Sequence, residues 1–326
     1  MLDYSKIEGT KIFITGGAGF IGSYIVEELL PYNPKKIIIV DNFLRGSNAN
    51  MATFASDQRV EFIEGDIRDS ALLEKCIEEV DYVFHCAALR INACAADQVA
   101  GYEVMVDATF RLVELCKKHK IKKVIYSSSA SVYGLAQNFP TPESDNPYDN
   151  QTFYGAAKMW GEGLFRSYKF MHDLDYVGFR YFNAYGPRMD TDGRYTEVMI
   201  KWLDCIRDNK VPLIYGDGSD SMDFVYVRDI AKANVAGMVA DVTDEVFNIG
   251  NCVETNLNEL CSTLLKVNKS DLKPDYRDVN TVNPVSRRLA DISKARRLLE
   301  FEPSTDLEAG LSELTHWYFK KQKQSV

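Results

Sequence analysis

The chain has 326 residues, of which 46% are hydrophobic, and its formal net charge is −9. This length suits one large α/β domain or a domain with a smaller lobe, and the apolar content can fill a substantial core. An acidic sequence without a basic run argues against nucleic acid and an anionic membrane surface as partners. Seven cysteines without a C-x-x-C pair do not suit a disulfide framework. The sequence has no signal-peptide pattern and no apolar run of about 18 residues, so we expect a cytoplasmic protein.

Apolar runs that predict strands alternate with amphipathic stretches that predict helices along the first part of the chain. The predicted strands are Lys11–Thr15, Lys36–Val40, Val60–Ile63, Tyr82–His85, Lys123–Ser127 and Tyr176–Arg180. The predicted helices are Gly19–Leu30, Ala71–Glu79, Tyr102–His119 and Tyr154–His172. This alternation indicates an α/β fold of the Rossmann type, with a doubly wound parallel sheet and helices on both faces.

Beyond Asn183 the alternation fades, and a smaller C-terminal lobe is expected. Segments rich in Gly, Asp and Pro predict loops at Tyr185–Arg194 and Gly216–Met222. Helices are expected at Glu197–Arg207, Val227–Val239 and Asp306–Lys321, and a short strand at Val246–Ile249. We therefore predict a sheet domain of residues 1–182 with 224–250, and a lobe of residues 183–223 with 251–326.

The first predicted strand runs into a glycine-rich turn, in which Gly16, Gly19 and Gly22 have the spacing G-x-x-G-x-x-G. A strand that turns tightly into a helix exposes backbone N–H groups at the helix N-terminus, where they can hold a phosphate. Glycine allows a pyrophosphate to approach the backbone and the helix to approach the sheet. Asp41 lies 19 residues after Gly22, where a carboxylate can bind an adenosine ribose hydroxyl. The pattern predicts a dinucleotide site, and a glycine-rich turn without a ligand is the alternative.

A tyrosine and a lysine lie one helical turn apart at Tyr154 and Lys158, so both project from one helix face. A nearby ammonium favours a phenolate and lowers the phenol pKa. Such a pair can exchange a proton with a sugar hydroxyl while hydride moves to a nicotinamide. Ser129, at the end of a predicted strand, can hydrogen-bond the same oxygen. A helix-surface pairing and a solvated serine-rich loop are the alternatives.

Together these motifs resemble the extended short-chain dehydrogenase/reductases, and above all the nucleotide-sugar epimerases and dehydratases typified by UDP-galactose 4-epimerase. The resemblance covers nearly the whole chain. It also rests on Gly65-Asp66-Ile67, His85-Cys86-Ala87-Ala88 and the segment from Arg180 to Pro187. It implies a tightly held NAD and a nucleoside-diphosphate sugar whose carbon is transiently oxidised. It further implies a homodimer in which the two long helices, Tyr102–His119 and Tyr154–His172, pair across a two-fold axis.

The resemblance also implies roles for individual residues. Ser129 polarises the sugar oxygen, Tyr154 is the base and Lys158 binds the nicotinamide ribose. The expected cofactor-binding residues are Gly16, Gly19, Phe20, Ile21, Gly22, Asp41, Asn42, Asp66, Ile67, Cys86, Ala87, Ala88, Arg90, Ser127, Tyr154, Lys158 and Tyr181. Asn183 and Ser129 are expected to contact the substrate. No metal site is expected, because the four histidines lack metal-ligand spacing.

The two residues after Ser129 limit which reaction of the family this chain can catalyse. Dehydratases of the family have Asp-Glu there, and decarboxylating relatives keep the Glu, but this chain has Ala130 and Ser131. Neither side chain can act as a general acid or base at neutral pH, so the elimination of water lacks both its acid and its base. The sequence favours epimerisation, most simply at C4. Net oxidation at C4 is the alternative, 4,6-dehydration the next, and a non-catalytic NAD-binding scaffold is the rival from another class.

The expected contacts to the substrate diphosphate also depart from the family. Met222 stands where an arginine usually grips the diphosphate, and Asn280 and Thr281 stand where a further arginine is usual. Arg288, with Arg287 as second choice, is the nearest replacement, since a guanidinium fork can bind two phosphate oxygens. A solvated arginine pair is the alternative. The nucleotide base and the sugar are left open.

Overall fold

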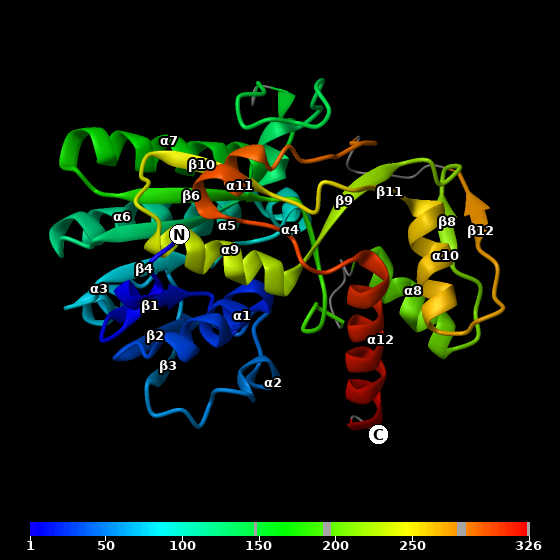
Figure 1. Ribbon diagram of the computed structural model, residues 1–326, viewed down its shortest axis with the longest axis horizontal. Coiled ribbons are helices and arrows are strands. Elements are labelled where there is room, and N and C mark those ends of the chain that lie inside the picture. Colours follow the sequence, from blue (N-terminus) through cyan, green and yellow to red (C-terminus); the bar gives the residue numbers. More distant parts are fainter. Residues whose placement is uncertain (147–148, 192–196, 279–284, 325–326) are drawn as a thin grey trace.

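Seven parallel strands form the central sheet of the protein, which a computed structural model describes for residues 1–146, 149–191, 197–278 and 285–324. The strand order is β10-β6-β5-β4-β1-β2-β3. The strands are β1 (Lys11–Thr15), β2 (Lys36–Asp41), β3 (Val60–Glu64), β4 (Tyr82–His85), β5 (Lys123–Ser129), β6 (Tyr176–Tyr181) and β10 (Glu245–Ile249). This confirms the predicted Rossmann-type architecture (Figure 1).

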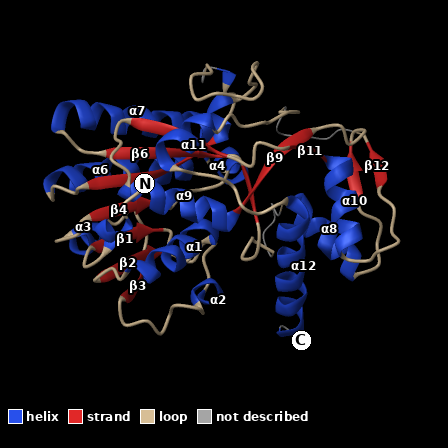
Figure 2. Cartoon of the chain, in the orientation of Figure 1, coloured by secondary structure: helices blue, strands red, loops and turns tan. Residues whose placement is uncertain are grey.

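Helices cover both faces of this sheet, as Figure 2 shows. One layer contains α1 (Phe20–Leu29), α9 (Val227–Val239) and α11 (Ser293–Leu299), and the other α3 (Ser70–Ile77), α6 (Ala108–Lys118) and α7 (Phe153–His172). In β1, Ile12 and Ile14 join the core under the first layer, whereas Phe13 joins the core under the second. Side chains alternate along a strand, so a strand buried on both faces reads as a continuous apolar run.

The helix predicted over Tyr102–His119 is interrupted. It continues from α5 (Gln98–Tyr102) through one π-helical turn at Glu103–Asp107 into α6. Just before α5, the short helix α4 (Ile91–Ala96) forms where no element was predicted. These short helices carry too few turns to show a clear apolar period.

The C-terminal lobe lies beside the sheet domain (Figure 1). Its helices are α8 (Val198–Arg207), α10 (Leu257–Val267) and α12 (Leu307–Gln324), and its strands are β7 (Asn183–Tyr185), β8 (Leu213–Tyr215), β9 (Ser221–Tyr226), β11 (Glu254–Asn256) and β12 (Asp275–Arg277). A three-stranded sheet has the order β11-β9-β7, and β12 pairs with β8. Trp202, Leu264 and Tyr318 lie in the separate apolar core of this lobe.

The predicted division between the two units differs from the structure around α11. Ala290, Ala295 and Leu299 are buried in the same core as the helices of the first layer, and α11 packs on β10. The chain therefore leaves the lobe, crosses back to the sheet domain and returns to the lobe with α12. A prediction from chain order missed this crossing, because α11 has only seven residues.

Candidate active site

A cleft of about 760 Å³ opens at the carboxyl ends of the sheet strands. The sheet domain contributes the ends of β1, β2, β4, β5 and β6 to its walls, and the lobe contributes the start of α8 and part of β9. The strand order reverses between β1 and β4, and ligands of open parallel sheets bind outside the strand ends at such a point. The cleft therefore lies where a nucleotide is expected.

The glycine turn of the cleft has no room for side chains. Gly16 has a φ of +73°, and a Cβ on it would lie 2.8 Å from the backbone nitrogen of Ala87. A Cβ on Gly22 would lie 2.3 Å from the carbonyl oxygen of Gly16. Helix α1 begins directly after Gly19, so the unpaired N–H groups of its first turn face this space. The turn thus has the close backbone approach and the free N–H groups that a pyrophosphate site requires.

Two carboxylates line the end of the cleft beyond the glycine turn. Asp41 accepts a hydrogen bond of 3.1 Å from the backbone N–H of Ala18. Asp66 accepts a bond of 2.9 Å from the amide of Asn42 and forms an ion pair of 3.0 Å with Arg68. Hydrogen bonds from Arg68 lower the pKa of Asp66 to about 2, so this group is ionised at neutral pH. Carboxylates held in this way can accept hydrogen bonds from ribose and adenine groups.

The three predicted catalytic residues come together across the cleft. Ser129 ends β5 and Tyr154 lies on α7, where the nearby Ser129 hydroxyl acts to lower the pKa of Tyr154. Lys158, one turn further along α7, lies with its Nζ 5.9 Å from the centroid of the Tyr154 ring. That Nζ donates a hydrogen bond of 2.6 Å to the carbonyl oxygen of Ser127. Ser127, like the three predicted catalytic residues, lines the cleft.

The pKa shifts of Tyr154 and Lys158 differ from the prediction. Burial raises the pKa of Tyr154, although the Ser129 hydroxyl and the charges of Arg90 and Arg45 act in the opposite direction. Burial also lowers the pKa of Lys158 to about 8. The expectation that Lys158 lowers the phenol pKa below its ordinary value is therefore wrong for this structure. Loss of hydration outweighs the neighbouring positive charges.

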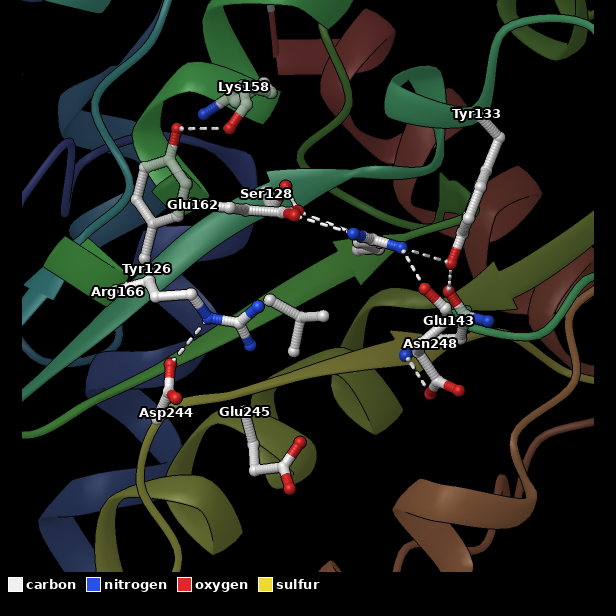
Figure 3. Close-up of polar contacts among 12 residues, drawn as sticks. Tyr126, Ser128, Tyr133, Glu143, Lys158, Glu162, Arg166, Asp244, Glu245 and Asn248 are labelled. Carbon is white, nitrogen blue, oxygen red and sulfur yellow. Dashed lines mark hydrogen bonds and ion pairs between the residues drawn. The ribbon is translucent and has the colours of Figure 1, made fainter. Parts of the chain in front are cut away.

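A buried polar network adjoins the β5 end that carries Ser129, and Figure 3 labels its members Ser128, Tyr133, Glu162 and Asn248. We call Ser128, Tyr133, Glu162, Arg180 and Asn248 the Arg180 cluster. Arg180 donates bonds of 2.9 and 2.7 Å to the two oxygens of Glu162 and one of 2.8 Å to the hydroxyl of Tyr133. Ser128 donates to Glu162, and Tyr133 donates to Asn248. The residue before Ser129 is thus anchored, and the end of β5 with it.

One arginine of the predicted pair reaches the cleft. Arg288 is only 8% exposed, lines the cleft and donates a hydrogen bond of 2.6 Å to the carbonyl oxygen of Ala130. Arg287 points elsewhere, because its guanidinium pairs with Glu254 at 2.7 Å and lies 4.4 Å from the ring centroid of Phe139. Arg287 is not among the residues that line the cleft, so the geometry favours Arg288.

The remaining predicted residues divide as follows. Met222 is half-buried in β9 and does not line the cleft. Asn183 does, and its side chain donates to the carbonyl oxygen of Asp223 at 3.2 Å. Asn280 and Thr281 lie outside the described residues. The predicted residues that line the cleft are Gly16, Gly19, Phe20, Ile21, Gly22, Asp41, Asn42, Asp66, Ile67, Cys86, Ala87, Ala88, Arg90, Ser127, Ser129, Tyr154, Lys158, Tyr181, Asn183 and Arg288.

Several charged residues of the cleft were not predicted. Glu197 pairs with Arg90 at 2.9 Å, and Asp190 pairs with Arg45 at 3.5 Å, so two ion pairs join the sheet domain to the lobe. Lys201 of α8 also lines the cleft. Arg45 could have been suspected from its place four residues after Asp41, the carboxylate predicted to bind ribose. The lobe residues carry no motif, and only the fold brings them to the cleft.

Within residues 1–146, 149–191, 197–278 and 285–324, no group of three or more His, Cys, Asp or Glu side chains could hold a metal ion. No helix of this part of the chain is both long and apolar enough to cross a membrane.

Known proteins are similar to this chain in sequence and in fold. Residues 12–250 match the family described as the NAD dependent epimerase/dehydratase family. The structure of a UDP-N-acetylglucosamine 4-epimerase from Methanobrevibacter ruminantium is 36% identical, with a TM-score of 0.90 over 96% of this chain and 99% of that chain. A UDP-glucose 4-epimerase from Thermotoga maritima is 30% identical, with a TM-score of 0.88 over 96% and 99%. A dTDP-glucose 4,6-dehydratase from Streptomyces venezuelae, crystallised with NAD, is 27% identical, with a TM-score of 0.88 over 96% and 98%.

Three observations agree with one another. Residues 12–250 match the family, the fold is similar to that of its members, and Ser129, Tyr154 and Lys158 line one cleft. NAD is the cofactor of this family, and the glycine turn and the carboxylates beside it fit NAD. The chain belongs to the NAD dependent epimerase/dehydratase family and is an enzyme of the extended short-chain dehydrogenase/reductase type.

Proposed function

We propose that this enzyme epimerises a UDP-sugar at C4 through a transient 4-keto sugar. The observation that carries the proposal is the Ser129–Tyr154 pair, which lies in the cleft next to two residues that cannot act as acid or base. Ala130 is buried, and Ser131 lines the cleft with a hydroxyl only. The names of the structurally similar 4-epimerases support UDP as the nucleotide.

The proposed reaction needs one proton transfer at the sugar oxygen in each direction. Ser129 orients the 4-hydroxyl through a hydrogen bond, and Tyr154 takes its proton as the C4–H hydride leaves. The glycine turn and Lys158 would hold NAD, which would supply the hydride acceptor and donor. Ser129 and the positive charges of Arg90 and Arg45 favour the phenolate, and they oppose the burial that raises the pKa of Tyr154.

Inversion requires the keto sugar to present its other face to the same hydride. The keto sugar would turn in the part of the cleft between Ser129 and the wall that the lobe forms, beyond the region lined by the glycine turn. Tyr154 then returns the proton to the 4-oxygen. Because no acid–base pair follows Ser129, water is not eliminated from the intermediate.

Net oxidation at C4 is the second candidate, because the same three residues would perform its first half. It requires the 4-keto sugar to leave before the hydride returns. A 4,6-dehydratase is the weakest candidate, since Ala130 and Ser131 replace the acid and base that the elimination needs.

Incubation of the enzyme with UDP-glucose, UDP-galactose and their N-acetylated forms tests the proposal. We expect a product of unchanged mass that NMR identifies as the C4 isomer, without a lasting NADH absorbance. A product lighter by one H₂, together with NADH, would establish net oxidation. A product lighter by one water would overturn the proposal and require an acid outside the Ser129 segment.

We also propose that the enzyme is a homodimer that pairs through α6 and α7. The outer sides of these neighbouring helices expose Phe110 and Trp160 at 43% and 36%, and Met171 at 65%. Light scattering on the purified protein tests this, and Trp160→Glu should shift a dimer towards monomer. The cytoplasmic location stays a prediction.

A further inference from the structure

Arg288 sits beside the catalytic serine rather than at the far end of the substrate site. Its Nη1 donates to the carbonyl oxygen of Ala130, the residue that follows Ser129, at 2.6 Å. The side chain is buried but lines the cleft, as do Ser129 and Ser131. A guanidinium has five N–H donors, and the bond to Ala130 uses one of them. The others can serve a ligand in the cleft.

The charge of Arg288 is not balanced by an acidic side chain of the described residues. Its described side-chain hydrogen bond goes to a neutral carbonyl, and no ion pair joins it to a described carboxylate. Burial lowers its pKa to about 10. Arg180, which is equally buried, has both oxygens of Glu162. Burying a cation without a counter-charge costs free energy, unless a bound anion pairs with it.

The position of this cation within the site selects among the anions of a nucleotide sugar. In the proposed reaction, Ser129 and Tyr154 hold the oxygen on C4. The diphosphate is attached to C1, on the opposite side of the pyranose ring, whereas C3 and C5 are the neighbours of C4. A guanidinium one residue from Ser129 is therefore near the substituents of C3 and C5. This placement differs from the diphosphate contact that the sequence predicted for Arg288.

We propose that Arg288 binds a carboxylate carried on the sugar ring next to C4, so that the preferred substrate is an acidic nucleotide sugar. The guanidinium fork binds both oxygens of the carboxylate in a charge-assisted contact. The diphosphate is then left to other donors, and Lys201 on the wall formed by α8 is one of them. The inference rests on the proposed 4-epimerase function and names its substrate class.

The test compares UDP-glucuronic acid with UDP-glucose, since these sugars differ only in the carboxylate at C6. Initial rates are measured by NMR for the NAD-loaded wild-type enzyme and for Arg288→Met, with Arg287→Met as the matched control. We expect wild-type kcat/KM to favour the acid by about 10- to 100-fold. Arg288→Met should remove most of this preference through KM, with UDP-glucose changed by no more than about threefold.

Binding measurements keep the inference testable if turnover is slow. Calorimetry on Tyr154→Phe, with and without Arg288→Gln, gives the affinities for the two sugars and for UDP alone. The inference requires that loss of Arg288 weakens only the acid. Equal loss for both sugars and UDP would assign Arg288 to the diphosphate, and unchanged affinities would assign it to the fold of the Ser129 segment. Either result overturns the inference.

The outcomes also separate this inference from the proposed function. Epimerisation of UDP-glucose without a preference for the acid would overturn the inference and leave the 4-epimerase intact. If neither sugar is isomerised, the proposed function fails, and the binding comparison still decides whether Arg288 recognises the carboxylate.

Discussion

Arg180 and Arg288 are both buried close to Tyr133, but their charges are satisfied in opposite ways. Although burial opposes it, the hydrogen bonds and charge of Glu162 raise the pKa of Arg180. Arg288 has the carbonyl of Ala130 instead, and burial lowers its pKa. The charge of Arg180 is paired within the protein by Glu162, and Arg180 anchors the end of β5. Arg288 retains donors for a ligand. Substitutions near Arg180 should therefore change stability, whereas substitutions in the cleft should change kinetics.

The largest expected effect is on stability, from Arg180→Met. This change leaves Glu162 buried without its partner, and breaking a buried pair in this way costs about 3–5 kcal/mol. Urea unfolding followed by circular dichroism measures the loss. The double variant Arg180→Met, Glu162→Met removes both charges and should recover most of it. A loss below about 1 kcal/mol would show that the Arg180 cluster does not stabilise the fold.

The next effect is kinetic and comes from Tyr154→Phe. The variant lacks the phenol that exchanges the proton, so kcat should fall at least about 100-fold, which corresponds to about 2.7 kcal/mol. The ring still packs, and the free energy of unfolding should stay within about 0.5 kcal/mol. Isomer formation by NMR and urea unfolding on the same samples check both parts. Turnover at the wild-type rate would remove Tyr154 from the mechanism.

The cofactor half of the site was predictable because its signals are local in sequence. Gly16, Gly22 and Asp41 have motif spacing, and the strand and helix that hold them have clear periods. The two arginines were different. Arg180 pairs with Glu162 across 18 positions and Arg288 bonds to Ala130 across 158, so only the fold reveals which of them lacks a counter-charge.

Much of the lobe escaped prediction for a related reason. Strands such as β7 have three residues, which is too short for an alternating pattern. β9 begins within the loop predicted at Gly216–Met222, and α10 was not predicted at all. The charged wall that Glu197 and Lys201 contribute depends on this part of the fold, so its residues were not recognised as part of the site.

A third buried cation, Lys123, allows the comparison of buried cations to be tested by measuring stability as a function of pH. Lys123, at the start of β5, donates to the carbonyl oxygens of Gly237 and Ala240. Burial lowers its pKa from 10.5 to about 8. The unfolded chain therefore binds more protons between these values, and the contribution of Lys123 to stability rises with pH through this window.

Lys123→Met lacks this contribution. Its stability relative to the wild type should fall by about 1–2 kcal/mol between pH 7.5 and 9.5, although its absolute stability at pH 7 can be higher. Urea unfolding at a series of pH values measures the difference, which cancels the titrations that the two proteins share. A difference that is constant with pH would mean that Lys123 keeps its ordinary pKa.

The smallest effect is expected at Arg287, the neighbour of Arg288. Its ion pair with Glu254 is partly exposed, with 47% of the arginine side chain accessible, and such pairs contribute only about 0.2–1 kcal/mol. Contact with the ring of Phe139 adds a similar amount. Arg287→Ala should therefore lower the free energy of unfolding by no more than about 2 kcal/mol, and KM for a UDP-sugar should stay within about twofold of wild type. Steady-state kinetics and urea unfolding measure the two quantities. A large rise in KM would place Arg287 at the substrate after all, and the contrast between the paired Arg180 and the unpaired Arg288 would no longer support the proposed binding of an anion by Arg288.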